Sequence, residues 1–222
     1  MALDPQFPWM FHRNEVDLLE EDLDDIYEQF KQEEPTPSIE DDLIEEQIQT
    51  EEYAEAEISM RMEPSWLMSK SSRTKDAIEF DTTSLRLELA REAERPPMYR
   101  QSYVWAQTVF LLGKEMYEKN FGLREDAFRM FLNAKMIPIK LSNAMIEESH
   151  DDPLSQEIAE NEYRLTIVYV TRVLEPLVKF QASFQDPTLL MLVQNGEKLK
   201  RALLEYVHRF GRRKQGSPNK PL

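Results

Sequence analysis

The sequence predicts an all-α protein, a bundle of about five or six helices with an acidic, largely disordered N-terminal arm. Two observations carry this prediction. After residue 82, long segments repeat apolar residues at steps of three and four, which is the spacing of an amphipathic helix. All five glycines lie at or beyond Gly113, so the first half of the chain lacks the residues that usually mark tight turns.

The charge is divided unevenly along the chain, and this division predicts the domain boundaries. Residues 1–63 carry 21 Asp and Glu against Arg13, Lys31 and Arg61, whereas the rest carries 21 acids and 24 Lys and Arg. Self-repulsion disfavours collapse of the first part. We therefore expect an arm with a linker over residues 1–81, a helical domain over 82–211, and a basic, disordered tail over 212–222.

The arm contains two stretches that predict transient amphipathic helices, at about 15–30 and about 39–58. Two prolines in "KQEEPTPS" separate them, because proline lacks the backbone donor that a helix interior needs. Ser38 precedes the second stretch and Asp41 follows three residues later, which is a near match to a capping box. The second helix is therefore expected to begin directly after Ser38, its N-cap.

Segments beyond residue 82 predict the helices of the domain. Asp152–Pro153 and Asp186–Pro187 each combine an N-cap residue with a first-turn proline. "RLTIVYVTRV" contains strand-forming residues, but we interpret it as helix because an all-round apolar helix suits a bundle centre. Asn195–Gly196 predicts a bend in the last helix, which should end before Gly211. The expected helices are residues 82–95, 102–120, 124–137, 138–149, 152 to about 180, and about 187 to 210.

Small and aromatic residues recur in residues 109–138, "VFLLGKEMYEKNFGLREDAFRMFLNAKMIP". Small residues let two antiparallel helices approach closely, while aromatic residues fill the space between them. We therefore expect Phe128 and Phe131 to be core residues. The order resembles one tetratricopeptide repeat, with Met116 where that family has an aromatic residue and with no second copy. The resemblance implies a helical hairpin that binds a peptide or protein. The matching residues are Leu112, Gly113, Tyr117, Ala127, Phe131, Ala134 and Pro138.

No pattern in the sequence predicts catalytic, cofactor-binding or metal-binding residues. His12, His150 and His208 are scattered, and His150 has no second histidine at the helical spacing that shares a metal. The glycines are too far apart for a phosphate-binding loop, and the chain has no cysteine for a disulfide or thiolate site. We therefore expect a non-enzymatic protein without cofactor or metal.

The first stretch of the arm carries an apolar seam, formed by Val16, Leu19, Leu23, Ile26 and Phe30. As a helix of the fold, the seam would pack on the bundle. As a binding helix, the seam would enter an apolar groove of a partner protein, because helix-in-groove recognition uses this spacing. Many like charges make the isolated helix marginal in water. The seam should therefore become ordered only against a groove.

A third interpretation of the same stretch is a short linear motif. "LDDIYE", with Leu23, Ile26 and Glu28, is similar to the docking sequence bound by B′-type regulatory subunits of the type 2A protein phosphatase. The resemblance implies that Leu23 and Ile26 fill two apolar pockets and that Glu28 meets a basic group. That docking mode is extended, so it competes with the helical interpretation.

Two further stretches of the arm are candidate partner sites. Ile48, Gln49 and Thr50 are similar to the anchor of dynein light chain ligands, which add a strand to a sheet edge. The alternative is the polar side of a charged helix. Trp66 and Leu67 form a short apolar patch in the linker, expected to dock on the helical domain or on a ligand.

These features predict a non-enzymatic interaction or adapter protein, a subunit of a larger complex. No stretch approaches the roughly eighteen apolar residues of a membrane span, and the start lacks a secretory signal, so we expect an intracellular protein, cytoplasmic or nuclear. The acidic arm would repel nucleic acid. The alternative function is an acidic chaperone for basic partners such as histones, and a third is a small helical enzyme with an unrecognised site. The oligomeric state is open.

Overall fold

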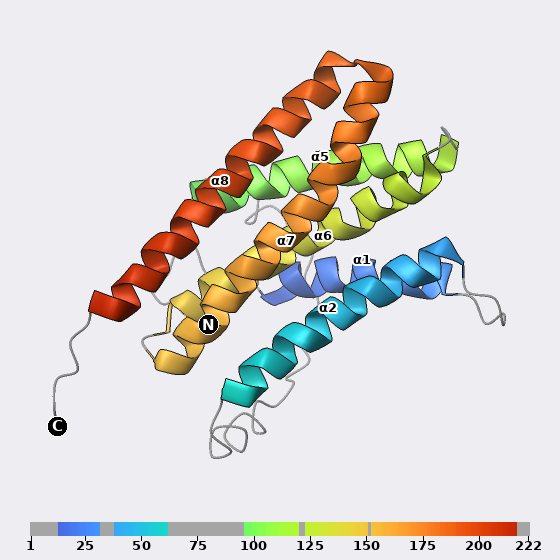
Figure 1. Cartoon of the computed structure of the whole chain (residues 1–222). Coiled ribbons are helices and arrows are strands. Elements are labelled where there is room, and N and C mark those ends of the chain that lie inside the picture. The colour runs from blue at the N-terminus through green and yellow to red at the C-terminus, as the bar shows by residue number, and fades with distance from the viewer. Residues whose placement is uncertain (1–12, 32–37, 62–95, 120–122, 151, 217–222) are drawn as a thin grey trace, which may run out of the picture.

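The computed structural model describes residues 13–31, 38–61, 96–119, 123–150 and 152–216. Within these ranges the chain is helical and contains no strand, which confirms the all-α class (Figure 1). Trp66, Leu67 and the helix expected at residues 82–95 lie outside them. The helices are α1 (Arg13–Phe30), α2 (Ile39–Arg61), α5 (Pro97–Lys119), α6 (Arg124–Glu148), α7 (Pro153–Phe184) and α8 (Pro187–Gly216).

The centre of the bundle is α6, not the helix that the sequence indicated. Every residue from Met130 to Ile139 is buried, and α6 contacts α5, α7, α1 and α2. The "RLTIVYVTRV" segment is helical as expected, but it belongs to α7, which keeps one face in solvent through Arg164 and Val168. The cause is the enclosure of α6 by four neighbouring helices, which its own sequence does not reveal.

The helix expected to end before Pro138 continues through it as one α6. A proline inside a helix removes a hydrogen bond and costs about 3 kcal/mol. Here Ile137, Ile139 and Leu141 around it are fully buried. Fully burying one such side chain contributes about 1.5–3 kcal/mol, so the packing around Pro138 offsets the cost of the proline.

Two predicted helix starts, after Ser38 and Asp152, are confirmed by their caps, whereas the helix predicted to begin at residue 102 begins at Pro97. Ser38 and Asp41 form a reciprocal box, in which the Ser38 backbone N–H donates to Asp41 Oδ2 at 2.8 Å and the Asp41 N–H donates to Ser38 Oγ at 3.2 Å. The Asp152 side chain accepts from the Ser155 N–H at 2.9 Å, with Pro153 at the first helical position. At the other end of the chain, α8 runs to Gly216, beyond the end predicted before Gly211.

Two buried glycines lie where helices approach each other closely. A Cβ built on Gly113 would lie 2.9 Å from Phe131 Cβ, so α5 and α6 approach as closely as the sequence predicted. Phe131 and its neighbour Phe128 are buried core residues, also as predicted. Gly196 lies against the Trp105 ring, and α8 passes through it unbroken.

The two acidic helices α1 and α2, here called the acidic hairpin, lie along one side of α6 and α7 (Figure 1). They cover the ranges at which the sequence predicted amphipathic helices. The boundary of an independent domain at residue 82 stays a prediction, because residues 62–95 lie outside the described ranges.

Candidate functional site

The apolar seam of α1 packs against the protein's own bundle. Leu19 and Leu23 are 5% and 6% exposed and belong to the core, and Ile26 and Phe30 are partly buried against it. Glu28 is exposed. The side chain of Val16 lies outside the described part of the structure. The structure therefore brings the seam together on α6 and leaves Glu28 in solvent.

Phe30 is the aromatic anchor of the seam. Its ring meets the Phe128 ring edge-on, with centroids 5.0 Å apart, and the Tyr117 ring with centroids 5.6 Å apart. Phe131 lies behind them, 6.4 Å from Phe30. Edge-to-face aromatic pairs contribute about 0.5–1.5 kcal/mol each beyond the area that they bury. The end of α1 is thus held in an aromatic pocket between α5 and α6.

Ion pairs join the acidic hairpin to the bundle along its length. We call the five cations involved the cationic seat: Arg124, Arg129, Lys135 and Lys140 of α6 and Arg172 of α7. Its ion pairs are Glu40–Arg124 at 3.0 Å, Glu46–Arg129 at 2.8 Å, Glu46–Arg172 at 3.1 Å, Asp22–Lys135 at 2.7 Å, and Glu51–Lys140.

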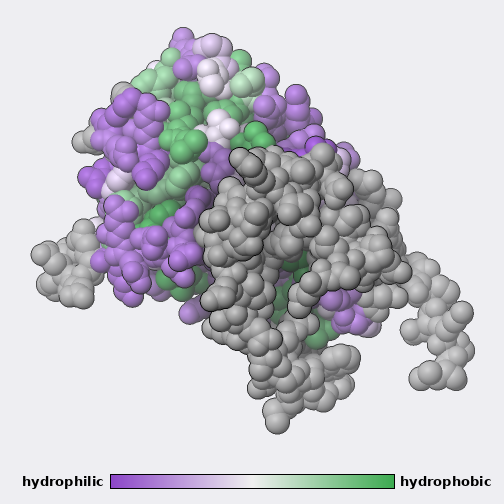
Figure 2. Space-filling model, turned by 180° about the vertical axis from the view of Figure 1, so that it is seen from behind, coloured by the Kyte–Doolittle hydropathy of each residue, from purple (hydrophilic) through white to green (hydrophobic). Residues whose placement is uncertain are grey.

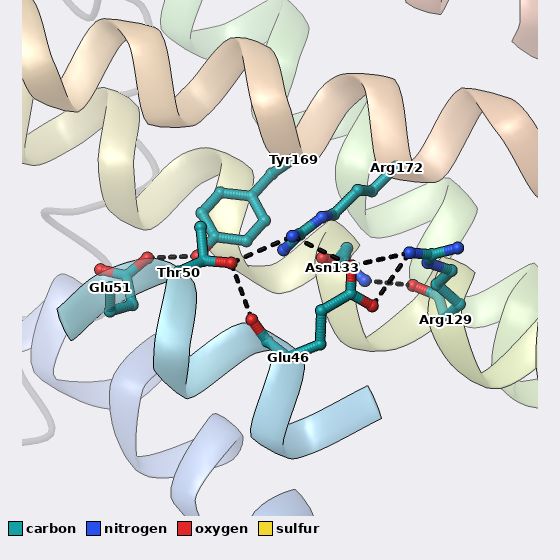
Figure 3. A network of polar contacts seen from close by, with 7 residues as sticks. All are labelled: Glu46, Thr50, Glu51, Arg129, Asn133, Tyr169 and Arg172. Carbon is teal, nitrogen blue, oxygen red and sulfur yellow. Dashed lines mark hydrogen bonds and ion pairs between the residues drawn. The ribbon is translucent and has the colours of Figure 1, made fainter. Parts of the chain in front are cut away.

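Glu46 is the central acceptor of this contact, because both arginines converge on its carboxylate (Figure 3). Thr50, one turn further along α2, donates to the Glu46 carbonyl at 2.7 Å and accepts from the Arg172 guanidinium at 3.0 Å. Asn133 donates to the Arg129 carbonyl at 2.7 Å. The network ties α2 to both α6 and α7.

The two short motifs lie in helices here. Leu23 of the phosphatase-like motif is buried, and Thr50 of the dynein-like motif is engaged by Arg172. Ile48 and Gln49 face solvent on α2. Both resemblances imply extended ligands, so α1 or α2 would have to unwind before either motif could bind in that way. Those two partners stay predictions.

The polar contact also contains a largely buried acid, Glu162. Glu162 of α7 lies 3.7 Å from the ammonium of Lys140, which also pairs with Glu51. Burial raises the pKa of Glu162 to about 7, although Lys140 opposes the shift. Burial alone would lower the pKa of Lys140, but Glu162 and Glu51 raise it above its ordinary value. Lys140 therefore stays charged near neutral pH, while Glu162 titrates there.

A groove lies on another side of the bundle, away from the acidic hairpin. It lies between α5, α6 and α8 and has a volume of about 1470 Å³. Val104 and Met191 line it and are 65% and 53% exposed, and Arg100 and Lys198 add positive charge. Figure 2 shows that apolar side chains gather in a band between hydrophilic ones on the face where α5 lies.

One wall of the groove contains a half-buried carboxylate, that of Glu148. Glu148 Oε2 accepts from the hydroxyls of Tyr163 and Tyr206, each at 2.7 Å. Burial raises the pKa of Tyr163, so this tyrosine stays protonated and donates. Glu148 and Tyr206 therefore form a fixed polar wall beside the apolar side chains.

The described residues contain no cluster of acids and histidines that could hold a metal. His150 lies exposed just beyond the end of α6. In the same ranges, no helix is long and apolar enough to cross a membrane.

Sequence reasoning missed both the groove and the cationic seat. A signal for the seat was present: Arg124 and Lys135, and likewise Arg129 and Lys140, stand eleven residues apart. Eleven residues are about three helical turns, so each couple lies on nearly the same side of α6. No protein family, curated protein or solved structure gave a significant match to the chain.

Proposed function

We propose that the protein is a non-enzymatic interaction protein, an adapter or subunit of a complex, that docks a partner helix in the groove between α5, α6 and α8. The observation that supports this best is the exposure of Val104 and Met191 inside the groove. Large exposed apolar side chains gathered in a hollow are typical of interaction sites. An intracellular setting belongs to the same proposal and rests on the cysteine-free composition.

The size and chemistry of the groove favour a helix or peptide over a small molecule. Its volume of about 1470 Å³ exceeds the range of roughly 300–1,000 Å³ that is usual for small-ligand pockets. Arg100 and Lys198 at its sides would favour acidic residues flanking the apolar face of the partner. The expected ligand is therefore an amphipathic helix with acidic flanks.

The test compares proteins captured from a cell extract by the immobilised full chain and by two variants. Val104→Glu places a charge in the groove and should abolish capture of the specific partner. Leu111→Glu is the matched control, because Leu111 is also on α5, is 63% exposed and does not line the groove. Circular dichroism must show that both variants fold. An identical set of partners on Val104→Glu would contradict the proposal.

A second function, an acidic chaperone for basic partners, is favoured by the outer face of the acidic hairpin. Exposed carboxylates cover this face. Charge-driven binding weakens steeply with ionic strength, whereas binding through an apolar groove weakens little. Loss of the partner in moderate salt, together with indifference to Val104→Glu, would favour the chaperone. The exposed carboxylates of the hairpin include Glu21, Asp24, Asp25, Glu28, Asp42, Glu45, Glu52 and Glu55.

A further inference from the structure

The surface beneath the acidic hairpin combines charge and apolar pockets in the manner of a helix-binding groove. All five cations of the seat face carboxylates of α1 or α2. Lys135 is buried to 6% exposure of its side chain, and its ammonium also lies 4.4 Å from the centroid of the Phe110 ring. Beside it, the aromatic pocket receives Phe30. An acidic helix with a spaced apolar seam is the ligand that this surface fits.

The hairpin itself carries features that make its seating reversible. Most of the ion pairs are partly exposed to solvent, and such pairs contribute little to stability. Gln47 on α2 is 1% exposed, yet neither atom of its side-chain amide has a hydrogen-bond partner. Burying an amide without partners opposes docking. The hairpin and the seat are therefore complementary in charge, but the buried amide of Gln47 opposes their contact.

The hairpin and the helices α5 to α8 are well separated in the sequence. Residues 62–95 separate α2 from α5, so the hairpin is tied to α5–α8 through a long stretch of chain. The helices α5, α6, α7 and α8 contact one another directly, and these contacts do not involve the hairpin. Because the hairpin belongs to the same chain as the seat, its binding there is intramolecular, and an incoming ligand must displace it.

We propose that the cationic seat and its aromatic pocket are a receptor for an acidic amphipathic helix of a partner protein. The protein's own hairpin is the resident competitor, which keeps the site closed until the partner displaces it. This surface lies apart from the groove between α5, α6 and α8, so the proposal stands or falls independently of the proposed function.

The experiment measures fluorescence anisotropy of labelled peptides added to the full chain. One probe is the peptide of residues 13–61. The second is a designed acidic helix of unrelated sequence with the apolar spacing of Leu19, Leu23, Ile26 and Phe30. A permuted peptide of the same composition is its control. Wild type should bind both probes weakly, because its own hairpin occupies the seat.

Two kinds of variant should change this binding in opposite directions. Leu19→Ala with Leu23→Ala in the full chain weakens the competitor but leaves the seat intact, so both probes should bind about tenfold tighter or more. Adding Lys135→Glu should remove that gain. A 13–61 peptide with Asp22→Lys should restore it, since Asp22 is the partner of Lys135. If circular dichroism shows that Lys135→Glu is unfolded, Arg129→Glu takes its place as the variant that should remove the gain, without the restoring peptide. Val104→Glu should leave the binding unchanged.

Three results would overturn the proposal. In the first, the Leu19→Ala, Leu23→Ala chain binds the probes no tighter than wild type. In the second, the permuted peptide binds as well as the designed helix, which would mean that the site recognises only the charge of the peptide. In the third, the variant forms a dimer that neither peptide dissociates. A second copy of the chain would then be the ligand of the seat.

Discussion

Replacing Gly196 by alanine should destabilise the protein, although alanine is the better helix former. Gly196 lies inside α8, where helix propensity alone would favour alanine by about 1 kcal/mol. The added Cβ would lie 2.5 Å from Trp105 Cζ2 and 2.7 Å from Leu174 Cδ2. Overpacking of this kind costs about 1–3 kcal/mol. The packing cost therefore opposes the gain in propensity.

Trp105 cannot move aside freely, because its indole N–H donates to the Leu192 carbonyl at 2.9 Å in the core. If the ring shifts and leaves this donor unpaired, a further cost of about 1–3 kcal/mol follows. Taking the middle of each range, we expect a net loss of about 3 kcal/mol. That corresponds to a fall in Tm of roughly 6–12 °C for a chain of this size.

Urea and thermal unfolding followed by circular dichroism measure the effect. Ala182→Gly, at an exposed position of α7, is the control and should lose about 1 kcal/mol through propensity alone. Combining Gly196→Ala with Leu174→Ala should cost less than the sum of the single variants, because the smaller side chain makes room. A Gly196→Ala protein as stable as wild type would refute the packing argument.

Three further predictions concern the core and the polar contact. Phe131→Ala should lower the free energy of unfolding by about 3–5 kcal/mol, because the ring is 3% exposed; an unchanged melt would place it at a surface. Gln47→Met should raise the free energy of unfolding by about 1 kcal/mol, because it removes an amide buried without partners; a loss on urea unfolding would contradict this. The pKa of Glu162 is raised to about 7 in the folded state, against 4.5 in the unfolded state. Between these two values the folded state binds a proton that the unfolded state has lost. The contribution of Glu162 to the free energy of unfolding is therefore full below pH 4.5 and is lost as pH rises through 7. The loss is at most about 3 kcal/mol. Glu162→Gln should flatten this part of the stability–pH curve, and an identical slope in the two proteins would exclude Glu162 as its source.

Local signals were sufficient for the fold class and for many helix starts. Spacing of apolar residues identifies a helix and its buried face, because both depend on the 3.6-residue turn alone. Ser38 and Asp152 act within three residues of themselves, so their caps were visible in the sequence. Phe131 and Gly113 were predicted as core and as a close approach for the same reason, since they belong to one helical hairpin.

Only the tertiary structure decided which surfaces meet. The seam of α1 has the same spacing whether it faces its own bundle or a partner, and the fold places Leu19 and Leu23 on α6. Pro138 stays inside a helix because the surrounding helices bury its neighbours. The local sequence at Gly196 predicts a bend, whereas in the fold Gly196 makes room for the Trp105 ring to pack against α8. Periodicity specifies one face of one helix, whereas the choice between faces depends on the combined packing and charge of elements far apart in the chain.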